Sequence, residues 1–337
     1  MNTFESALMA RLGADLGDNT IVVNTCAVTG EAERQCRQTI RRLRRENPTA
    51  QIVVVGCAVQ LNPALYASMP EVDRVLGNHE KLNPQLLHEK SKCVVGPIDA
   101  PFQLPIVHEF EGRNKAFLQI QQGCDHHCTF CVVRLSRGPN KGLPPDQVVE
   151  QAKAFVRAGF LEIVLTGADV VSYPYGFVAI SERLLKEVPE IKRLRFGSLD
   201  PAGLKEDFIE LVKNYPQVMP HFHFSIQSGD DDILRKMARR HLHVFPYSER
   251  PETPAIKMMQ VEKSIRKERA KQLRALGQRL YQDLLQKTLG QEVSVLVESD
   301  QAGWTENYLH VLLKQPYHAG EVVKVKISGV KENELVE

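Results

Sequence analysis

The chain has 337 residues, of which 43% are hydrophobic and 25% charged, with a net charge of +2. This length predicts two or three domains with buried cores, and the near-neutral charge provides no global field for coating a nucleic acid. No apolar run reaches the ~18 residues of a membrane span, and the first residues lack the pattern of a secretory signal. We therefore expect a cytoplasmic protein without membrane contact.

Seven cysteines in a chain without an export signal indicate metal or redox chemistry and argue against a disulfide framework. Three of them lie within eight residues of one another, so one segment concentrates much of the thiol chemistry. The seven are Cys26, Cys36, Cys57, Cys93, Cys124, Cys128 and Cys131.

Residues 1–99 alternate between helical and strand-like patterns, which predicts an α/β domain with a parallel sheet. Apolar spacing and charge predict helices at 4–16 and 31–45. Short apolar runs typical of buried strands lie at 20–24, 51–56 and 73–76.

A proline-containing linker at 100–107 leads into residues 108–288, where strands and helices again alternate. Repeated βα units predict a full or partial barrel with its chemistry at the C-terminal strand ends. The predicted strands are 115–121, 162–166, 193–198, 221–227 and 242–247, and the predicted helices are 146–158, 180–188, 205–215, 230–240 and a long basic helix at 261–289.

Residues 289–337 change character, with β-rich runs at 292–298, 309–314 and 321–327 divided by glycine and proline. This pattern predicts a small all-β domain, namely a barrel.

The clearest chemical signal is the CxxxCxxC spacing of Cys124, Cys128 and Cys131 directly after a predicted strand. Three thiolates this close can hold three irons of a 4Fe–4S cluster and leave the fourth iron open to a small molecule. A zinc site with His126 or His127 as a fourth ligand and unpaired buried cysteines are the alternatives.

A CxxxCxxC loop at the end of the first strand of a βα barrel resembles the radical S-adenosylmethionine enzymes. Further segments resemble the methylthiotransferases of that superfamily, and the end of the chain resembles their RNA-binding TRAM domain. Residues 26–29 and 70–77 are most similar to the MtaB branch, which acts on threonylcarbamoyladenosine beside the anticodon of tRNA. The other segments are 24–29, 56–58, 165–169, 198–201, 225–229 and 245–248.

The resemblance implies that S-adenosyl-L-methionine binds the open iron and is cleaved to a radical that removes hydrogen from carbon 2 of the adenine. A second molecule of this cofactor would methylate sulfur on an auxiliary 4Fe–4S cluster. It further implies a tRNA substrate and an electron donor such as flavodoxin or ferredoxin, and we expect a monomer. The branches acting on isopentenyladenosine or on a ribosomal protein fit residues 26–29 less well.

The auxiliary cluster of the family has three cysteine ligands in the first domain, and Cys26 and Cys57 match two of them. By themselves these two are also compatible with small buried side chains at strand ends. The third position falls before Met1 in the family pattern, so we expect one cluster to form and the second site to be incomplete. Cys36, on a charged helix, and Cys93, in a loop, match no ligand position.

The resemblance places the backbone at Thr166 and Gly167 against the cofactor, with Ser198 and Gln227 facing the same barrel mouth. Each is also compatible with an ordinary strand-end residue. Arg137, after the cysteine loop, fits a contact with cofactor or RNA phosphate and equally a solvated side chain.

Basic helices are where RNA phosphates would bind in a near-neutral chain, which predicts RNA contacts at Arg41, Arg44, Lys267 and Arg274. Solvated helix faces are the alternative. Trp304, with Tyr308 and His310, fits stacking on bases and equally the core of the β domain.

One segment and two single residues depart from the family pattern. Residues 239–241 run directly into 242–247, where the family has on the order of 45 more residues; we expect a barrel lacking about one strand. Arg134 replaces a usual proline and Glu252 a usual glycine. A degenerate, non-catalytic RNA-binding remnant is therefore the alternative to an active enzyme.

Overall fold

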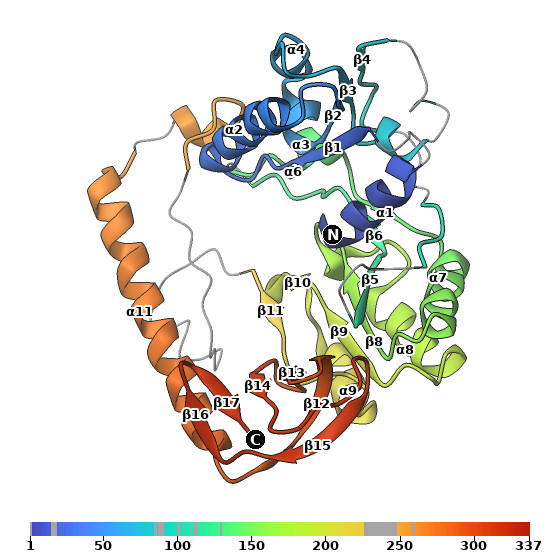
Figure 1. Cartoon of the computed structure of the whole chain (residues 1–337), viewed down its shortest axis with the longest axis vertical. Helices are drawn as coiled ribbons and strands as arrows, with labels where there is room; N and C mark the ends of the chain where they lie inside the picture. Colours follow the sequence, from blue (N-terminus) through green and yellow to red (C-terminus); the bar gives the residue numbers. More distant parts are fainter. Residues whose placement is uncertain are drawn as a thin grey trace.

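The computed structural model describes residues 2–14, 19–83, 86, 91–99, 102, 104–108, 110, 114–128, 130–225, 248–257 and 260–337. The first domain contains a four-stranded parallel sheet in the order β1-β2-β3-β4, which confirms the predicted α/β pattern (Figure 1). The strands are β1 (Thr20–Thr25), β2 (Gln51–Gly56), β3 (Arg74–Leu76) and β4 (Cys93–Val94). The helices are α1 (Asn2–Ala14), α2 (Gly30–Glu46), α3 (Cys57–Leu61) and α4 (Pro63–Ala67).

Strand β4 corrects the prediction that Cys93 lies in a loop, because Cys93 pairs with Val75 of β3. A two-residue strand carries no alternation that a sequence pattern could reveal.

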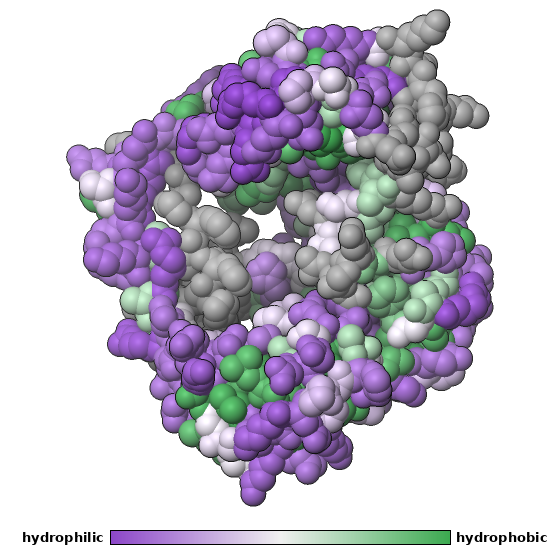
Figure 2. Space-filling view, in the orientation of Figure 1, coloured by the Kyte–Doolittle hydropathy of each residue, from purple (hydrophilic) through white to green (hydrophobic). Residues whose placement is uncertain are grey.

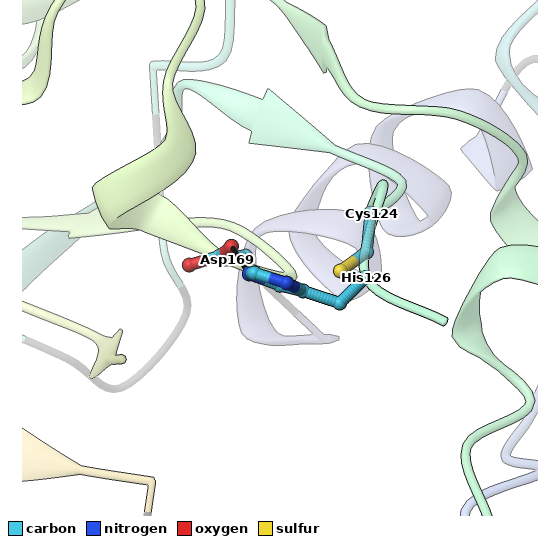
Figure 3. A group of neighbouring side chains, drawn as sticks. All are labelled: Cys124, His126 and Asp169. Atoms are coloured by element: carbon cyan, nitrogen blue, oxygen red, sulfur yellow. Dashed lines mark ion pairs between the residues drawn. The ribbon is translucent and has the colours of Figure 1, made fainter. Parts of the chain in front are cut away.

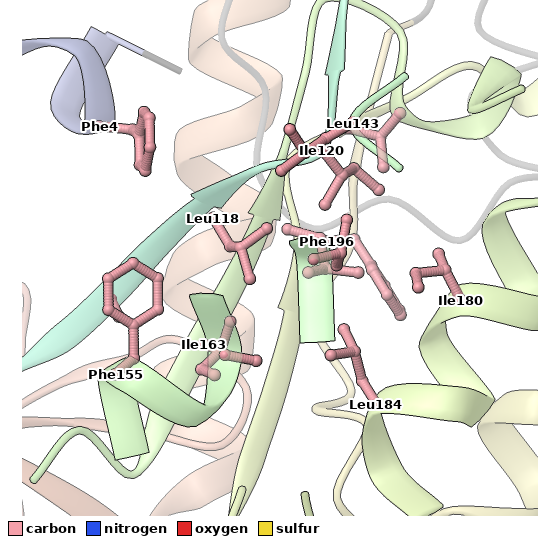
Figure 4. Packing of buried hydrophobic residues seen from close by; sticks show 14 of the residues in the cluster. Phe4, Leu118, Ile120, Leu143, Phe155, Ile163, Ile180, Leu184 and Phe196 are labelled. Atoms are coloured by element: carbon pink, nitrogen blue, oxygen red, sulfur yellow. The ribbon is translucent and has the colours of Figure 1, made fainter. Parts of the chain in front are cut away.

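Helix α1 joins the first domain to the second. Phe4 is 1% exposed and belongs to one buried cluster that also contains Val53 of β2 and Leu118 of the second domain. Figure 4 shows Phe4 reaching from α1 toward Leu118 and Phe155. The two domains therefore share a continuous hydrophobic core.

In the second domain, β5, β8 and β9 form a parallel sheet, and β10 and β11 continue in parallel beyond it. An antiparallel pair, β6 with β7, brackets the cysteine loop. The strands are β5 (Lys115–Gln119), β6 (Gln121–Gln122), β7 (Lys141–Gly142), β8 (Glu162–Thr166), β9 (Arg193–Phe196), β10 (Ser198–Leu199) and β11 (His223–Phe224). The helices are α6 (Val133–Arg137), α7 (Pro145–Arg157), α8 (Phe177–Glu187) and α9 (Glu206–Asn214).

Alternating strands and helices confirm the predicted βα organisation over the described part of this domain. The predicted helix at 230–240 and strand at 242–247 lie outside the described residues. Short 3-10 helices occur at Glu80–Leu82, Val170–Ser172, Pro201–Gly203 and Pro254–Lys257.

Helix α11 (Lys263–Thr288) runs to a six-stranded sheet in the order β15-β12-β13-β14-β17-β16 (Figure 1). Leu285 of α11 is buried in the core of this sheet with Val295 and Val311. No helix among the described residues is long and apolar enough to cross a membrane. The strands are β12 (Glu292–Ser299), β13 (Ala302–Thr305), β14 (His310–Leu312), β15 (Val322–Lys326), β16 (Gly329–Lys331) and β17 (Glu334–Val336).

Candidate metal centre

The three clustered cysteines lie in one loop between β6 and α6. Gly123 turns the chain at φ 75°, and a Cβ at this position would lie 1.9 Å from the carbonyl oxygen of Pro139, so glycine is required. The amide of Cys124 donates to the carbonyl of Gly138 at 3.2 Å, and the amide of Cys131 donates to that of Cys128 at 3.1 Å. The backbone therefore fixes the loop at both ends.

The thiols of this loop share one environment. Burial raises the pKa of Cys124 and Cys131, and the neighbouring Cys128 thiol raises both further. Three sulfur donors gathered in one loop fit a 4Fe–4S cluster with one open iron. The raised pKa values do not prevent this, because a bound metal replaces the thiol protons.

Arg134 closes the same loop from α6. Its Nη1 donates to the carbonyl of Cys124 at 3.4 Å and to Asp125 Oδ1 at 3.2 Å. The amide of Asn140 donates to the same Asp125 oxygen at 3.1 Å. The arginine at this usual proline position thus braces the loop.

Gln121 is a positioning residue that the sequence did not single out. Its fully buried side chain donates from Nε2 to the carbonyl of Gly123 at 2.7 Å, and its Oε1 accepts from the amide of Asp169 at 2.9 Å. A Cβ at Gly167 would lie 2.6 Å from that Oε1. Gln121 therefore ties the end of β8 to the start of the cysteine loop, and Gly167 allows the close approach.

Two other predicted cofactor residues, Thr166 and Ser198, lie on strands β8 and β10. Thr166 is the last residue of β8, and its Oγ1 donates to the carbonyl of Leu118 at 3.4 Å. Ser198 of β10 shares a hydrogen bond with Ser225, 2.7 Å between the hydroxyl oxygens. Gln227 lies outside the described residues.

Cys26 and Cys57 lie next to each other at the end of the first sheet. They directly follow Thr25 of β1 and Gly56 of β2, which are paired in register. Gly56 has φ 105°, and a Cβ there would lie 2.4 Å from the carbonyl oxygen of Thr25. Burial raises the pKa of Cys26, and the charges of the Cys57 and Cys36 thiols raise it further.

A buried charged network surrounds Cys57. Arg137 is 4% exposed; its Nε donates to Cys57 Sγ at 3.1 Å and its Nη1 to Glu5 Oε1 at 2.6 Å. Lys81 Nζ donates to Glu5 Oε2 at 2.9 Å and to Asn78 at 3.0 Å, and Asn78 in turn donates to Cys57 Sγ at 3.6 Å. Hydrogen bonds to a cysteine sulfur are the outer-shell contacts that a cluster ligand uses. The burial of Arg137 excludes the solvated side chain that the sequence allowed. Its pairing with Glu5 and Cys57 takes the place of the predicted contact with RNA phosphate.

The predicted RNA residues have different surroundings. Arg44 clamps α2 to the sheet, donating to the carbonyls of Ala50 at 2.7 Å and Glu71 at 3.1 Å and pairing with Asp73. Arg41 is half exposed, 3.8 Å from Glu71. Arg44 therefore has a structural role, which a run of basic residues does not reveal.

Trp304 lies where the β domain meets the second domain. Its ring stacks on Tyr308 at 4.7 Å between centroids, and its Nε1 donates to Glu298 at 2.7 Å. Lys115 Nζ lies 5.3 Å from the same ring. These contacts favour the packing interpretation of Trp304, and base stacking stays a prediction.

Lys267 and Arg274 are exposed on α11. Figure 2 shows hydrophilic side chains over both α2 and α11.

Glu252 has surroundings that explain its replacement of glycine. Its carboxylate lies 3.6 Å from the buried Arg250, and among the described non-glycine residues only Tyr308, Glu332 and Asn333 have positive φ. The backbone at 252 therefore has no need of glycine.

Known proteins resemble this chain over nearly its whole length. Residues 118–244 match the model of the Radical SAM superfamily, and residues 2–77 match Uncharacterized protein family UPF0004. The threonylcarbamoyladenosine tRNA methylthiotransferase MtaB of Rickettsia prowazekii is 37% identical over 394 aligned residues, covering 98% of this chain and 93% of the relative. The enzymes of that name from Aquifex aeolicus and Bacillus subtilis are 30% and 29% identical, covering 93% and 98% of this chain and 92% and 90% of those relatives. The chain therefore belongs to the MtaB-like family of radical S-adenosylmethionine methylthiotransferases.

Proposed function

We propose that this chain is a tRNA methylthiotransferase that adds a methylthio group to carbon 2 of threonylcarbamoyladenosine next to the anticodon. The observation that carries the proposal is the 37% identity to an enzyme of this name across 98% of the chain. The cysteine loop at the strand ends of the second domain supports it, because this is where a βα domain places its chemistry.

The family implies 4Fe–4S clusters and S-adenosyl-L-methionine. Cys124, Cys128 and Cys131 would hold one cluster, and with its bound cofactor this cluster would supply the radical chemistry. Gln121 and Gly167 position the end of β8, where the backbone at Thr166 would line the cofactor site. Ser198 and Gln227 would complete this side of the mouth.

Cys26 and Cys57 would supply two of the three cysteine ligands that the auxiliary cluster of the family uses. Arg137 and Asn78 would orient Cys57 through their hydrogen bonds to its sulfur, 3.1 and 3.6 Å long. Glu5 fixes the guanidinium of Arg137, so α1 contributes to this site without being a ligand.

The domains would be 1–99, 108–288 and 289–337, with the last a TRAM-like RNA-binding barrel and the second a barrel lacking about one strand. The alignment with the Rickettsia prowazekii enzyme spans 394 positions, whereas this chain has 337 residues. The difference supports an internal gap in this chain relative to that enzyme. The same gap favours the second candidate, a non-catalytic RNA-binding remnant.

The test is mass spectrometry of tRNA nucleosides from cells lacking the gene and from cells complemented with it. We expect the methylthio form of threonylcarbamoyladenosine to return with the wild-type gene. It should stay absent with the triple variant Cys124→Ser, Cys128→Ser and Cys131→Ser. Failure of the wild-type gene, with tRNA binding retained in vitro, would establish the remnant.

A further inference from the structure

A sulfur, a nitrogen and an oxygen converge beside the cysteine loop. Cys124 Sγ, a ring nitrogen of His126 and a carboxylate oxygen of Asp169 all lie within 4.8 Å of one another (Figure 3). Within this group His126 Nε2 and Asp169 Oδ2 lie 3.2 Å apart. His127, the adjacent residue, is not part of this group.

Asp169 is built into the fold. Its side chain is 7% exposed, its amide is held by Gln121, and its Oδ2 accepts from Ser172 Oγ at 2.5 Å. Its Oδ1, the oxygen that faces neither Ser172 nor His126, is buried and has no hydrogen-bond partner among the residues that the structure describes. A buried carboxylate oxygen without a partner is costly, so the Asp169 carboxylate has capacity for one further ligand beyond its contacts with Ser172 and His126.

We propose that Cys124, His126 and Asp169 form a mononuclear site for a divalent transition metal such as Zn²⁺. Thiolate, imidazole and carboxylate are the donors that this ion prefers, with water as a fourth ligand. Metal–ligand bonds of about 2.0–2.1 Å in a tetrahedron separate nitrogen from oxygen by about 3.3 Å. His126 Nε2 and Asp169 Oδ2 are 3.2 Å apart, which is the distance of an ordinary ion pair and also lets both atoms bind one metal without moving apart. Asp200, 3.6 Å from the same nitrogen, adds negative charge.

This site and the 4Fe–4S cluster exclude each other, because one Cys124 sulfur cannot serve both. The loop therefore has a one-metal state that uses one cysteine and a cluster state that uses three. A bound divalent ion would hold Cys124 and hinder cluster assembly until it leaves.

Metal binding to the full chain, free of iron and under anaerobic conditions, tests the proposal. Cys26→Ser and Cys57→Ser remove the other adjacent thiols from every sample. We expect one Zn²⁺ per chain, and a loss of affinity of about tenfold or more with His126→Ala and with Asp169→Asn. His127→Ala is the matched control and should bind as the parent does, as should Cys128→Ser and Cys131→Ser.

X-ray absorption at the zinc edge should show one sulfur among nitrogen and oxygen ligands. Three sulfurs, together with equal losses from Cys124→Ser, Cys128→Ser and Cys131→Ser, would overturn the proposal in favour of a zinc site made by the three thiols. Absence of Zn²⁺ binding would overturn it as well.

Reconstitution gives an independent readout. Zinc added first should reduce assembly of the roughly four irons per chain of one cluster in the parent and not in His126→Ala. Equal inhibition in both would contradict the shared use of Cys124. No step measures methylthio transfer, so the result is independent of the proposed function.

Discussion

Glu5 lies between two buried cations, Arg137 at 2.6 Å and Lys81 at 2.9 Å. Burial alone would raise the pKa of this carboxyl, but the charges and hydrogen bonds of Arg137 and Lys81 hold it well below its ordinary value. A carboxyl with a lowered folded-state pKa stabilises the protein above its unfolded-state pKa of about 4.3. That contribution is lost as the pH falls from there toward the folded-state pKa, at about 1.4 kcal/mol per pH unit.

Glu5→Gln should therefore lower the free energy of unfolding at neutral pH by about 3–5 kcal/mol, because it leaves Arg137 and Lys81 buried without a counter-charge. Urea unfolding should show the gap to wild type narrowing between about pH 4.3 and 3.5. Glu31→Gln, which alters exposed contacts with Arg34 and Gln35, is the control and should change little. A gap that stays constant down to the lower pH would contradict this origin.

At the scale of elements, the turn after β6 determines whether the cysteine loop can form. Gly123 and Gly159 both have positive φ, 75° and 93°. A Cβ at Gly123 would lie 1.9 Å from a backbone oxygen, whereas one at Gly159 meets nothing within 4 Å. We expect Gly123→Ala to abolish iron binding by the loop on reconstitution. Gly159→Ala, the control, should lower the free energy of unfolding by only the backbone strain of about 1–2 kcal/mol, and this variant should bind iron as the wild type does. Similar iron contents in the two variants would be evidence against a role for the turn.

Two exposed basic residues of helix α11 allow the predicted RNA contacts to be tested. Lys267 and Arg274 are seven residues apart, which puts them on one helix face. The double variant Lys267→Gln and Arg274→Gln should weaken tRNA binding and flatten its salt dependence by about 0.7–0.9 in log–log slope for each phosphate that the variant no longer neutralises. Lys213→Gln, an exposed lysine of α9 paired with Glu210, is the control. An unchanged slope would assign α11 to a structural role.

The elements also show what the sequence can and cannot predict. Strands β2 and β8 coincide with their predicted bounds, because a buried parallel strand is a continuous apolar run. Strands β4, β7, β13, β16 and β17 were not predicted, since two to four residues carry no periodicity.

The same limit applies to the site. The cysteine spacing was visible in the sequence, whereas the contact between Glu5 and Arg137 joins residues 132 positions apart. Gln121 carried no motif at all. For Arg44 the sequence predicted an RNA contact, but a run of arginines does not reveal which of them binds the protein's own carbonyl groups and carboxylates.

At the scale of the whole molecule, two arginines of β9 connect the second domain to the C-terminal sheet. Arg195 is 3% exposed; it donates to Glu162 at 2.8 Å, to the carbonyl of Thr305 at 3.0 Å and to that of Glu306 at 2.9 Å. Arg193 donates to the carbonyls of Ser294 and Trp304 at 2.9 and 3.1 Å. Glu162 is the buried counter-charge that both arginines share.

Arg195→Met should therefore loosen the C-terminal sheet from the rest of the chain. The variant removes the Glu162 partner that lies 2.8 Å away, leaves Arg193 at 3.6 Å, and removes the donors to two β-domain carbonyls. The expected cost is about 3–5 kcal/mol. Calorimetry should show an earlier transition, and hydrogen exchange should accelerate at the backbone of β13. Arg183→Met, which removes exposed pairs with Asp146 and Glu187, is the matched control and should leave both unchanged. If the backbone of β13 exchanges at the wild-type rate in Arg195→Met, other contacts hold the C-terminal sheet. The β9 arginines then do not set the position of that sheet relative to the second domain.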